Sequence, residues 1–85
     1  MTDPILPDVH LNGTNRDDLI DLRCNVLDAL RDVDKALAAM APNGRDYYTT
    51  PGKMTLAENQ HRDRQNRLKA LIDDLTREVE MIADL

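Results

Sequence analysis

Apolar side chains recur at intervals of three and four residues along two long stretches of the chain. The first stretch carries Leu19, Leu22, Val26, Leu30, Val33, Leu37 and Met40, and the second carries Leu68, Leu71, Ile72, Leu75, Val79 and Ile82. This spacing places the apolar side chains on one face of an α-helix. The pattern therefore predicts an all-α fold, with one helix over about residues 15–41 and a second over about residues 54–84.

The two predicted helices are separated by a predicted loop over residues 42–53. Residues 42–44 read Pro-Asn-Gly and end the first helix, and the Asn or the Gly is expected to form a left-handed C-cap. Residues 1–13 contain two prolines and show no periodicity, which predicts an extended arm. Residues 14–85 then form the helical part of the chain.

Capping patterns precede both helices. Thr14, followed three residues later by Asp17, resembles a capping box, in which two side chains bond reciprocally to backbone amides. The second helix has two possible starts, one at Thr50-Pro51 and one at Thr55, which forms a complete capping box with Glu58. The second helix is therefore expected to begin between Pro51 and Thr55.

The apolar pattern of the second helix is interrupted over Glu58–Arg67, where ten consecutive side chains are polar or charged. Extending the apolar face backward at about 100° per residue places His61, Arg64 and Gln65 on the face that packs against the first helix. An antiparallel return of the chain brings Asp34 close to His61 and Arg64. Two interpretations stay open: Asp34 forms a buried ion pair with one of them, or the polar face holds a ligand.

The composition limits how these helices are stabilised. The chain has 85 residues, two Tyr and no Phe or Trp, so a single antiparallel two-helix hairpin buries little surface. We expect such hairpins to assemble into an oligomeric helical bundle. Cys24 is the only cysteine, which excludes a disulfide within one chain and is typical of the cytoplasm. No apolar run is long enough for a membrane span, and no metal or other cofactor is expected, because neither histidine has a second ligand nearby.

Charge is distributed unevenly along the chain. The net charge of −5 argues against binding to long nucleic acids. Between Arg45 and Lys69 there are six basic and three acidic side chains, whereas the remainder carries five basic and thirteen acidic ones. This contrast predicts a local site for a small anion, with a solvated helix face as the alternative.

Two groups of polar residues are candidate binding sites for such an anion. The first offers arginines for phosphate, tyrosines for stacking and polar groups for sugar or base edges: Arg45, Asp46, Tyr47, Tyr48, His61, Arg62, Arg64 and Gln65. The second comprises His10, Asn12 and Thr14 before a helix N-terminus, whose free amides favour anions. The alternative for both is structural, a buried ion pair in the first and helix capping in the second. The groups lie about 40 Å apart along one hairpin, so they meet only between subunits packed head to tail.

Three short motifs stand out because their residues are polar and lie off the apolar stripes. They are His-x-Asn-Gly-Thr from His10, Gly-Arg-Asp-Tyr-Tyr from Gly44, and a His-Arg pair from His61. In these motifs the chain resembles a group of short phage and prophage proteins of uncharacterised function, although two threonines here separate the tyrosines from the proline. It is more distantly similar to oligomeric phage sponges, which bind the nucleotide signals of CBASS or Thoeris immunity without cleaving them.

Two hypotheses of different classes follow. In the first, the protein is a homo-oligomeric phage-type protein in the bacterial cytoplasm that sequesters a nucleotide-derived immune signal, a cyclic oligonucleotide or an ADP-ribose derivative, without cleaving it. In the alternative, it is a homo-oligomeric protein-interaction module, a phage accessory protein or an inhibitor of a host protein, with no small-molecule ligand. Neither is an enzyme, because no nucleophile–base pair, catalytic carboxylate pair or phosphate loop is visible.

Overall fold

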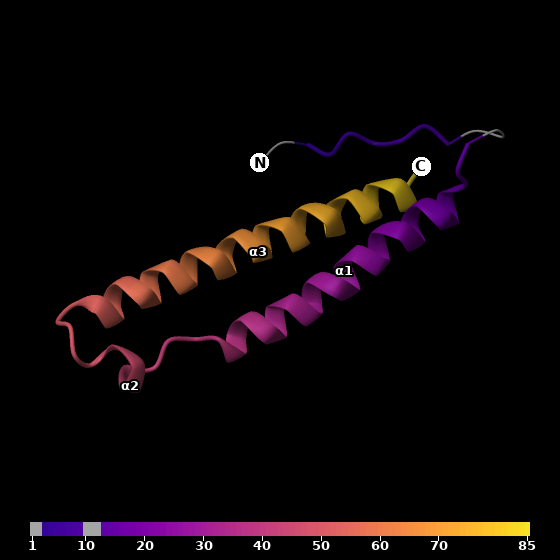
Figure 1. Cartoon of the computed structure of the whole chain (residues 1–85). Coiled ribbons are helices and arrows are strands. Elements are labelled where there is room, and N and C mark those ends of the chain that lie inside the picture. Colours follow the sequence, from indigo (N-terminus) through magenta and orange to yellow (C-terminus); the bar gives the residue numbers. More distant parts are fainter. Residues whose placement is uncertain (1–2, 10–12) are drawn as a thin grey trace.

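The computed structural model describes residues 3–9 and 13–85, which form three helices and no strand. α1 spans Arg16–Ala39, α2 spans Gly44–Tyr47 and α3 spans Lys53–Ala83. α1 and α3 lie side by side and run in opposite directions, and the short α2 lies in the connection between them (Figure 1). The prediction of an all-α fold is confirmed.

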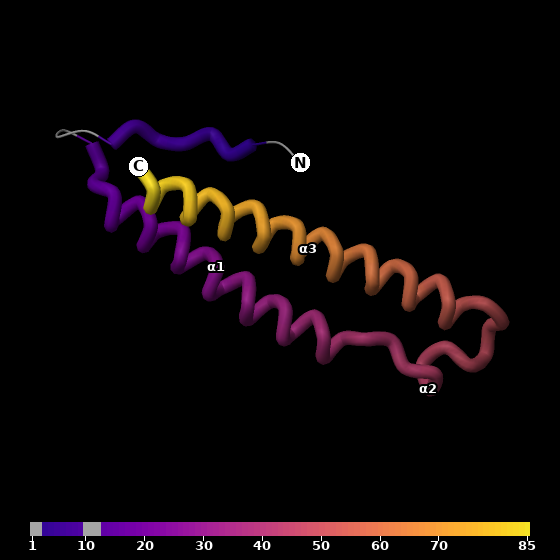
Figure 2. Tube along the Cα trace, turned by 180° about the vertical axis from the view of Figure 1, so that it is seen from behind, coloured from indigo at the N-terminus to yellow at the C-terminus, as the bar shows by residue number. Residues whose placement is uncertain are grey.

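The pairing of two long helices makes the molecule elongated, with extents of 63, 23 and 16 Å. Figure 2 shows the same arrangement from behind, with the segment that precedes α1 running beside α3. Asp3 in this segment forms an ion pair of 2.8 Å with Arg77 of α3. Within the described ranges, no helix has the length and hydropathy needed to cross a membrane.

α1 begins one residue later than the predicted capping box. Its N-cap is Asn15, whose Oδ1 accepts a hydrogen bond of 2.9 Å from the backbone amide of Asp18. Nδ2 of Asn15 donates to the Asp18 carboxylate at 3.0 Å. The predicted box of Thr14 and Asp17 is therefore wrong, because Asn15 and Asp18 have the same spacing and Asn caps a helix at least as well as Thr.

α2 lies inside the predicted loop and was not predicted by the periodicity. α1 ends with Met40 as C-cap at φ −88°, so the left-handed cap predicted at Asn43 or Gly44 is wrong. Asn43 caps α2 instead: its Oδ1 accepts a hydrogen bond of 3.0 Å from the amide of Arg45, and its Nδ2 donates to the Asp46 carboxylate at 3.0 Å. The Asp46 side chain therefore contributes to the shape of this turn.

α3 begins within the predicted range of Pro51 to Thr55, but before its predicted capping box. Its N-cap is Gly52 at φ +81°, the one described residue with a positive φ, and its first helical residue is Lys53. The left-handed conformation is available to Gly52 at little cost, because glycine has no Cβ. The predicted box of Thr55 and Glu58 is wrong, since Thr55 already lies inside the helix.

The contact between α1 and α3 buries few side chains fully. Among the described residues the buried apolar side chains are Leu19, Leu27 and Ile82, and His61 is the buried polar one. Large apolar side chains of the predicted stripe on α1 remain 47–59% exposed: Leu22, Val26, Val33 and Met40. One chain alone therefore leaves an apolar face of α1 uncovered.

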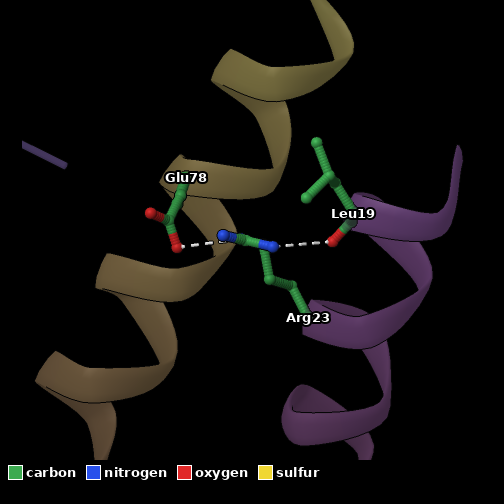
Figure 3. Close-up of polar contacts among 3 residues, drawn as sticks. All are labelled: Leu19, Arg23 and Glu78. Carbon is green, nitrogen blue, oxygen red and sulfur yellow. Dashed lines mark hydrogen bonds and ion pairs between the residues drawn. The ribbon is translucent and has the colours of Figure 1, made fainter. Parts of the chain in front are cut away.

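An ion pair joins the two long helices (Figure 3). Nε of Arg23 lies 3.2 Å from Oε2 of Glu78, and Nη1 of Arg23 donates to the backbone oxygen of Leu19 at 3.0 Å. The two charged side chains are 23% and 17% exposed, so water screens them only in part. The periodicity places Arg23 on the apolar side of α1 but does not identify Glu78 as its partner.

Candidate functional site

A cavity of about 250 Å³ lies at the end of the helix pair that carries α2. Its lining comes from the C-cap of α1, the connection that follows it, α2 and the first turns of α3: Met40, Pro42, Tyr47, Ala57, Gln60, His61 and Arg64. Arg64 lies four residues after Gln60 and three after His61, so its side chain is a neighbour of both on the surface of α3. The cavity thus combines an aromatic ring, an imidazole, an amide and a guanidinium group.

His61 is the most unusual side chain of this cavity. It is 7% exposed, and neither Nδ1 nor Nε2 has a hydrogen-bond partner among the residues that the structure describes. A buried polar atom without a partner costs about 1–3 kcal/mol of folding free energy. Because folded proteins satisfy nearly all such atoms, an unpartnered imidazole that lines a cavity is a place where water or a ligand can complete the hydrogen bonds.

The predicted ion pair of Asp34 with His61 or Arg64 is wrong. Asp34 is exposed, and it forms no ion pair in the part of the chain that the structure covers. The nitrogens of His61 likewise have no partner there. The structural interpretation that depended on Asp34 therefore loses its support.

The alignment of the helices explains this error. Arg23 and Glu78 lie opposite each other. The residues that lie equally far from this ion pair toward the loop are Asp34 on α1 and Arg67 on α3, so these two lie at the same level. Arg67 is already paired with Asp63 at 3.0 Å. Counting further reaches Met40 opposite His61, and both residues line the cavity. The loop geometry, which no local pattern encodes, shifts α3 relative to the simple hairpin pairing.

The structure brings together only part of the predicted ligand-binding group. Tyr47, His61 and Arg64 line the cavity. The other members do not line it: Arg45, Asp46, Tyr48 and Arg62 are exposed, and Gln65 is half-buried. At the opposite end of the helix pair Thr14 is exposed, and His10 and Asn12 lie outside the described residues.

Four lining residues were missed by the sequence analysis: Met40, Pro42, Ala57 and Gln60. Gln60 belongs to the polar stretch of α3 and lies four residues before Arg64, a spacing that places both side chains on one helix face. That spacing is the signal that identifies Gln60. Met40 and Pro42 carry no such signal, because their place beside His61 depends on the alignment of the two helices.

Positive charge gathers beside the cavity. Arg64 is exposed and has no ion pair within the described residues. The Lys53 ammonium lies 5.9 Å from the centroid of the Tyr47 ring, which is within the range of a cation–π contact. This charge favours an anionic ligand with a planar group beside Tyr47.

A second hollow of about 480 Å³ lies at the start of α1, lined by Val9, Asn15, Arg16, Asp17 and Asp18. The backbone amide of Asp18 already donates its hydrogen bond to Oδ1 of Asn15, so it is not free to bind an anion. The two aspartates also repel an anion. The α2 end of the molecule is therefore better suited to an anion than the N-terminal end.

The cavity has the groups for non-covalent binding of a small ligand. Its volume of about 250 Å³ lies just below the ~300–1,000 Å³ of typical ligand pockets, so it holds one ring system and leaves the rest of a nucleotide outside. Within the described residues, no group of three or more His, Cys, Asp or Glu side chains is placed to hold a metal ion. No protein-family model, curated protein or solved structure matches this chain. The function is therefore inferred from the residues and their geometry.

Proposed function

We propose that the protein binds and sequesters a small nucleotide-derived anion at the α2 end of its helix pair, without cleaving it. The observation that carries this proposal is His61, which is buried beside the cavity with both ring nitrogens unpartnered in the described part of the chain. A ligand in the cavity offers these nitrogens the hydrogen bonds that the protein does not. Burial of the unpartnered nitrogens lowers the stability of the free protein, and hydrogen bonds to the ligand offset this cost when it binds.

Each lining group has a distinct role in this proposal. The Arg64 guanidinium binds a phosphate, because its planar donors match two phosphate oxygens. The Tyr47 ring stacks on the base, and His61 with Gln60 hydrogen-bonds its polar edge or a ribose hydroxyl. Arg45 and Arg62 are exposed nearby in sequence and contact the parts of the ligand that extend beyond the cavity.

The proposed biological setting follows from the phage-like motifs. The ligand is an immune signal of the host, either a cyclic oligonucleotide or an ADP-ribose derivative, and the protein acts in the cytoplasm of an infected bacterium. The chains form hairpins that assemble into an oligomeric bundle. Assembly is supported by the exposed apolar side chains of α1, and a neighbouring copy enlarges a cavity that is small for a whole nucleotide.

A protein-interaction module is the second candidate function. It is favoured by the half-exposed Leu22, Val26 and Val33, which offer an apolar helix face to a partner. In that case the cavity holds no small molecule, and His61 is a tolerated defect of the core. The two candidates differ in whether the purified protein binds nucleotides.

Isothermal titration calorimetry with cyclic dinucleotides, cyclic trinucleotides and ADP-ribose derivatives tests the proposal. We expect one of these classes to bind with a Kd in the micromolar range or below, and chromatography to recover it intact. Tyr47→Leu should weaken this binding by roughly ten-fold or more, because a stacked base is worth about 1–3 kcal/mol.

Tyr48→Leu is the matched control for this experiment. Tyr48 is the next residue, is 81% exposed and does not line the cavity, so its loss should change Kd by less than about three-fold. The proposal is wrong if no ligand class gives binding heat. It is also wrong if the two substitutions weaken binding equally.

A further inference from the structure

A regular row of exposed side chains follows one face of α1. It comprises Leu22, Val26, Ala29, Val33, Ala36 and Met40, all of which are exposed, and we call it the outer seam of α1. The intervals alternate between four and three residues, which is the heptad spacing of a helix that packs along its length against another helix. The buried Leu27 and the half-buried Leu30 and Leu37 follow a neighbouring face, so the outer seam lies beside the contact with α3.

The side chains of the outer seam are complementary in size to those of a second outer seam that runs in the opposite direction. In an antiparallel pair of α1 helices centred on Arg31, three kinds of layer form: Leu22 with Met40, Val26 with Ala36, and Ala29 with Val33. Each valine of one copy meets an alanine of the other, so large and small side chains alternate and fill the space between the helices. A parallel pair instead places each alanine opposite the same alanine, which leaves gaps in the interface.

We propose that the outer seam of α1 binds a second copy of this chain in an antiparallel, two-fold symmetric dimer. Such an isologous interface uses the same surface on both subunits, which is what a self-complementary seam requires. Binding to an unrelated partner would not require the large and small side chains of the seam to pair with each other in an antiparallel alignment. The seam spans about 27 Å of α1 at 1.5 Å per residue, long enough to bury several layers of side chains.

A second apolar residue lies at the level of the proposed symmetry axis. Counting from the Arg23–Glu78 ion pair, the centre of the seam at Arg31 lies level with Ala70 on α3. The next residue, Leu71, is 45% exposed. α3 therefore also exposes an apolar side chain at the level of the proposed axis, and two copies joined there combine four long helices in one bundle.

The dimer also adds to the candidate site. Met40 lines the cavity and belongs to the outer seam, where it meets Leu22 of the partner subunit. The N-terminal turns of α1 in one subunit therefore lie beside Met40, next to the cavity of the other subunit. This consequence rests on the proposed ligand function, whereas the dimer itself does not.

Two alanine substitutions on α1 test the dimer. Ala36 belongs to the outer seam, and Ala38 is exposed two residues further on, off the seam. By analytical ultracentrifugation of the ligand-free protein, we expect the wild type and Ala38→Glu to sediment as a dimer or a larger even-numbered oligomer of the 9.6 kDa chain. Ala36→Glu should weaken dimerisation by roughly 100-fold or more, because it buries an unpaired carboxylate in each half of the interface. Circular dichroism should show equal helix content in both variants.

The direction of the pairing is tested by electron–electron distance measurements. Spin labels are attached at Asp21→Cys or Arg31→Cys in a Cys24→Ala background, so that each chain carries one label. In the antiparallel dimer the labels at position 21 are separated along the axis by about 30 Å more than those at position 31. A parallel dimer gives similar distances for both positions.

The outcomes separate the dimer from the ligand proposal. A monomeric wild type, equal dissociation of Ala36→Glu and Ala38→Glu, or equal label distances overturns the antiparallel dimer. Those results leave the calorimetric test of ligand binding unaffected. A dimer that behaves as expected but binds no nucleotide keeps this inference and removes the proposed ligand function.

Discussion

His61 shows how binding and stability compete at a single side chain. Its position on α3 is one at which an apolar residue would pack against α1, and the chain places an imidazole there instead. Burial of both nitrogens without a partner in the described residues lowers the stability of the free protein. Such a cost is typical of sites that are completed by something outside the chain.

Replacing His61 with leucine separates these two effects. His61→Leu should raise the free energy of unfolding by about 1 kcal/mol, because it removes two buried polar atoms that lack partners. It should also abolish the binding of the nucleotide ligand. Urea unfolding at a fixed protein concentration measures the first effect, and calorimetry the second.

Gln65→Leu provides the control, since Gln65 is a half-buried polar residue one turn further along α3 that does not line the cavity. It should leave ligand affinity unchanged. A loss of stability in His61→Leu would contradict this account, because it would mean that the imidazole already has partners in the folded protein.

For a single residue, helical periodicity predicts the buried side of a helix only in part, since Arg64 was placed on the packing face of α3 and is exposed. It places His61 toward α1, where the structure buries it. It does not establish which residue of α1 lies opposite, and the Asp34 ion pair was mispredicted for that reason. Which residue of α1 lies opposite a given residue of α3 depends on how the two helices align. That alignment depends on the loop and on contacts far from it, such as Arg23 with Glu78.

The Arg23–Glu78 ion pair joins α1 to α3, and its free energy is open to measurement. Glu78→Gln should lower the free energy of unfolding by about 1–2 kcal/mol, because the amide oxygen can still accept a hydrogen bond but no longer balances the charge of the partly buried Arg23 guanidinium. The double variant Arg23→Met, Glu78→Leu should recover most of this loss, since apolar groups can replace a buried ion pair. Urea unfolding of each variant provides the measurement.

Asp28→Asn is the matched control, because Asp28 forms an ion pair of 3.1 Å with Arg31 on the surface of α1, where both side chains are more than half exposed. Its loss should change stability by less than about 0.5 kcal/mol. Equal effects of Glu78→Gln and Asp28→Asn would show that the ion pair between the helices contributes no more to stability than an ion pair on the surface of one helix.

The element scale also shows where local signals succeed and fail. Both long helices follow from the apolar spacing, since each turn repeats the same geometry. Their predicted starts agree with Arg16 and Lys53, but the predicted capping residues were wrong, because several residues near each end are able to cap a helix, and Asn15 and Gly52 do so in place of Thr14 and Thr55. α2 is only four residues long, too short for a periodic signal, yet it supplies Tyr47 to the cavity.

The whole molecule is long and thin, with a small core for its surface. Three apolar side chains are buried in the described part of the chain, and four large ones of α1 are about half exposed. A two-helix pair of this kind gains little from hydrophobic burial alone. If a second copy covers the outer seam of α1, folding and association become linked, and stability depends on how much protein is present.

Thermal unfolding at several protein concentrations tests this linkage. For a dimer of two 85-residue chains, a ten-fold increase in concentration should raise Tm by roughly 3–5 °C, because each unfolding event releases two chains. Ala36→Glu should have a lower Tm that no longer changes with concentration, while Ala38→Glu should follow the wild type. Far-UV circular dichroism provides the measurement. A wild-type Tm that stays constant over a hundred-fold dilution series would mean that one helix pair is stable alone and that the exposed face of α1 serves another partner.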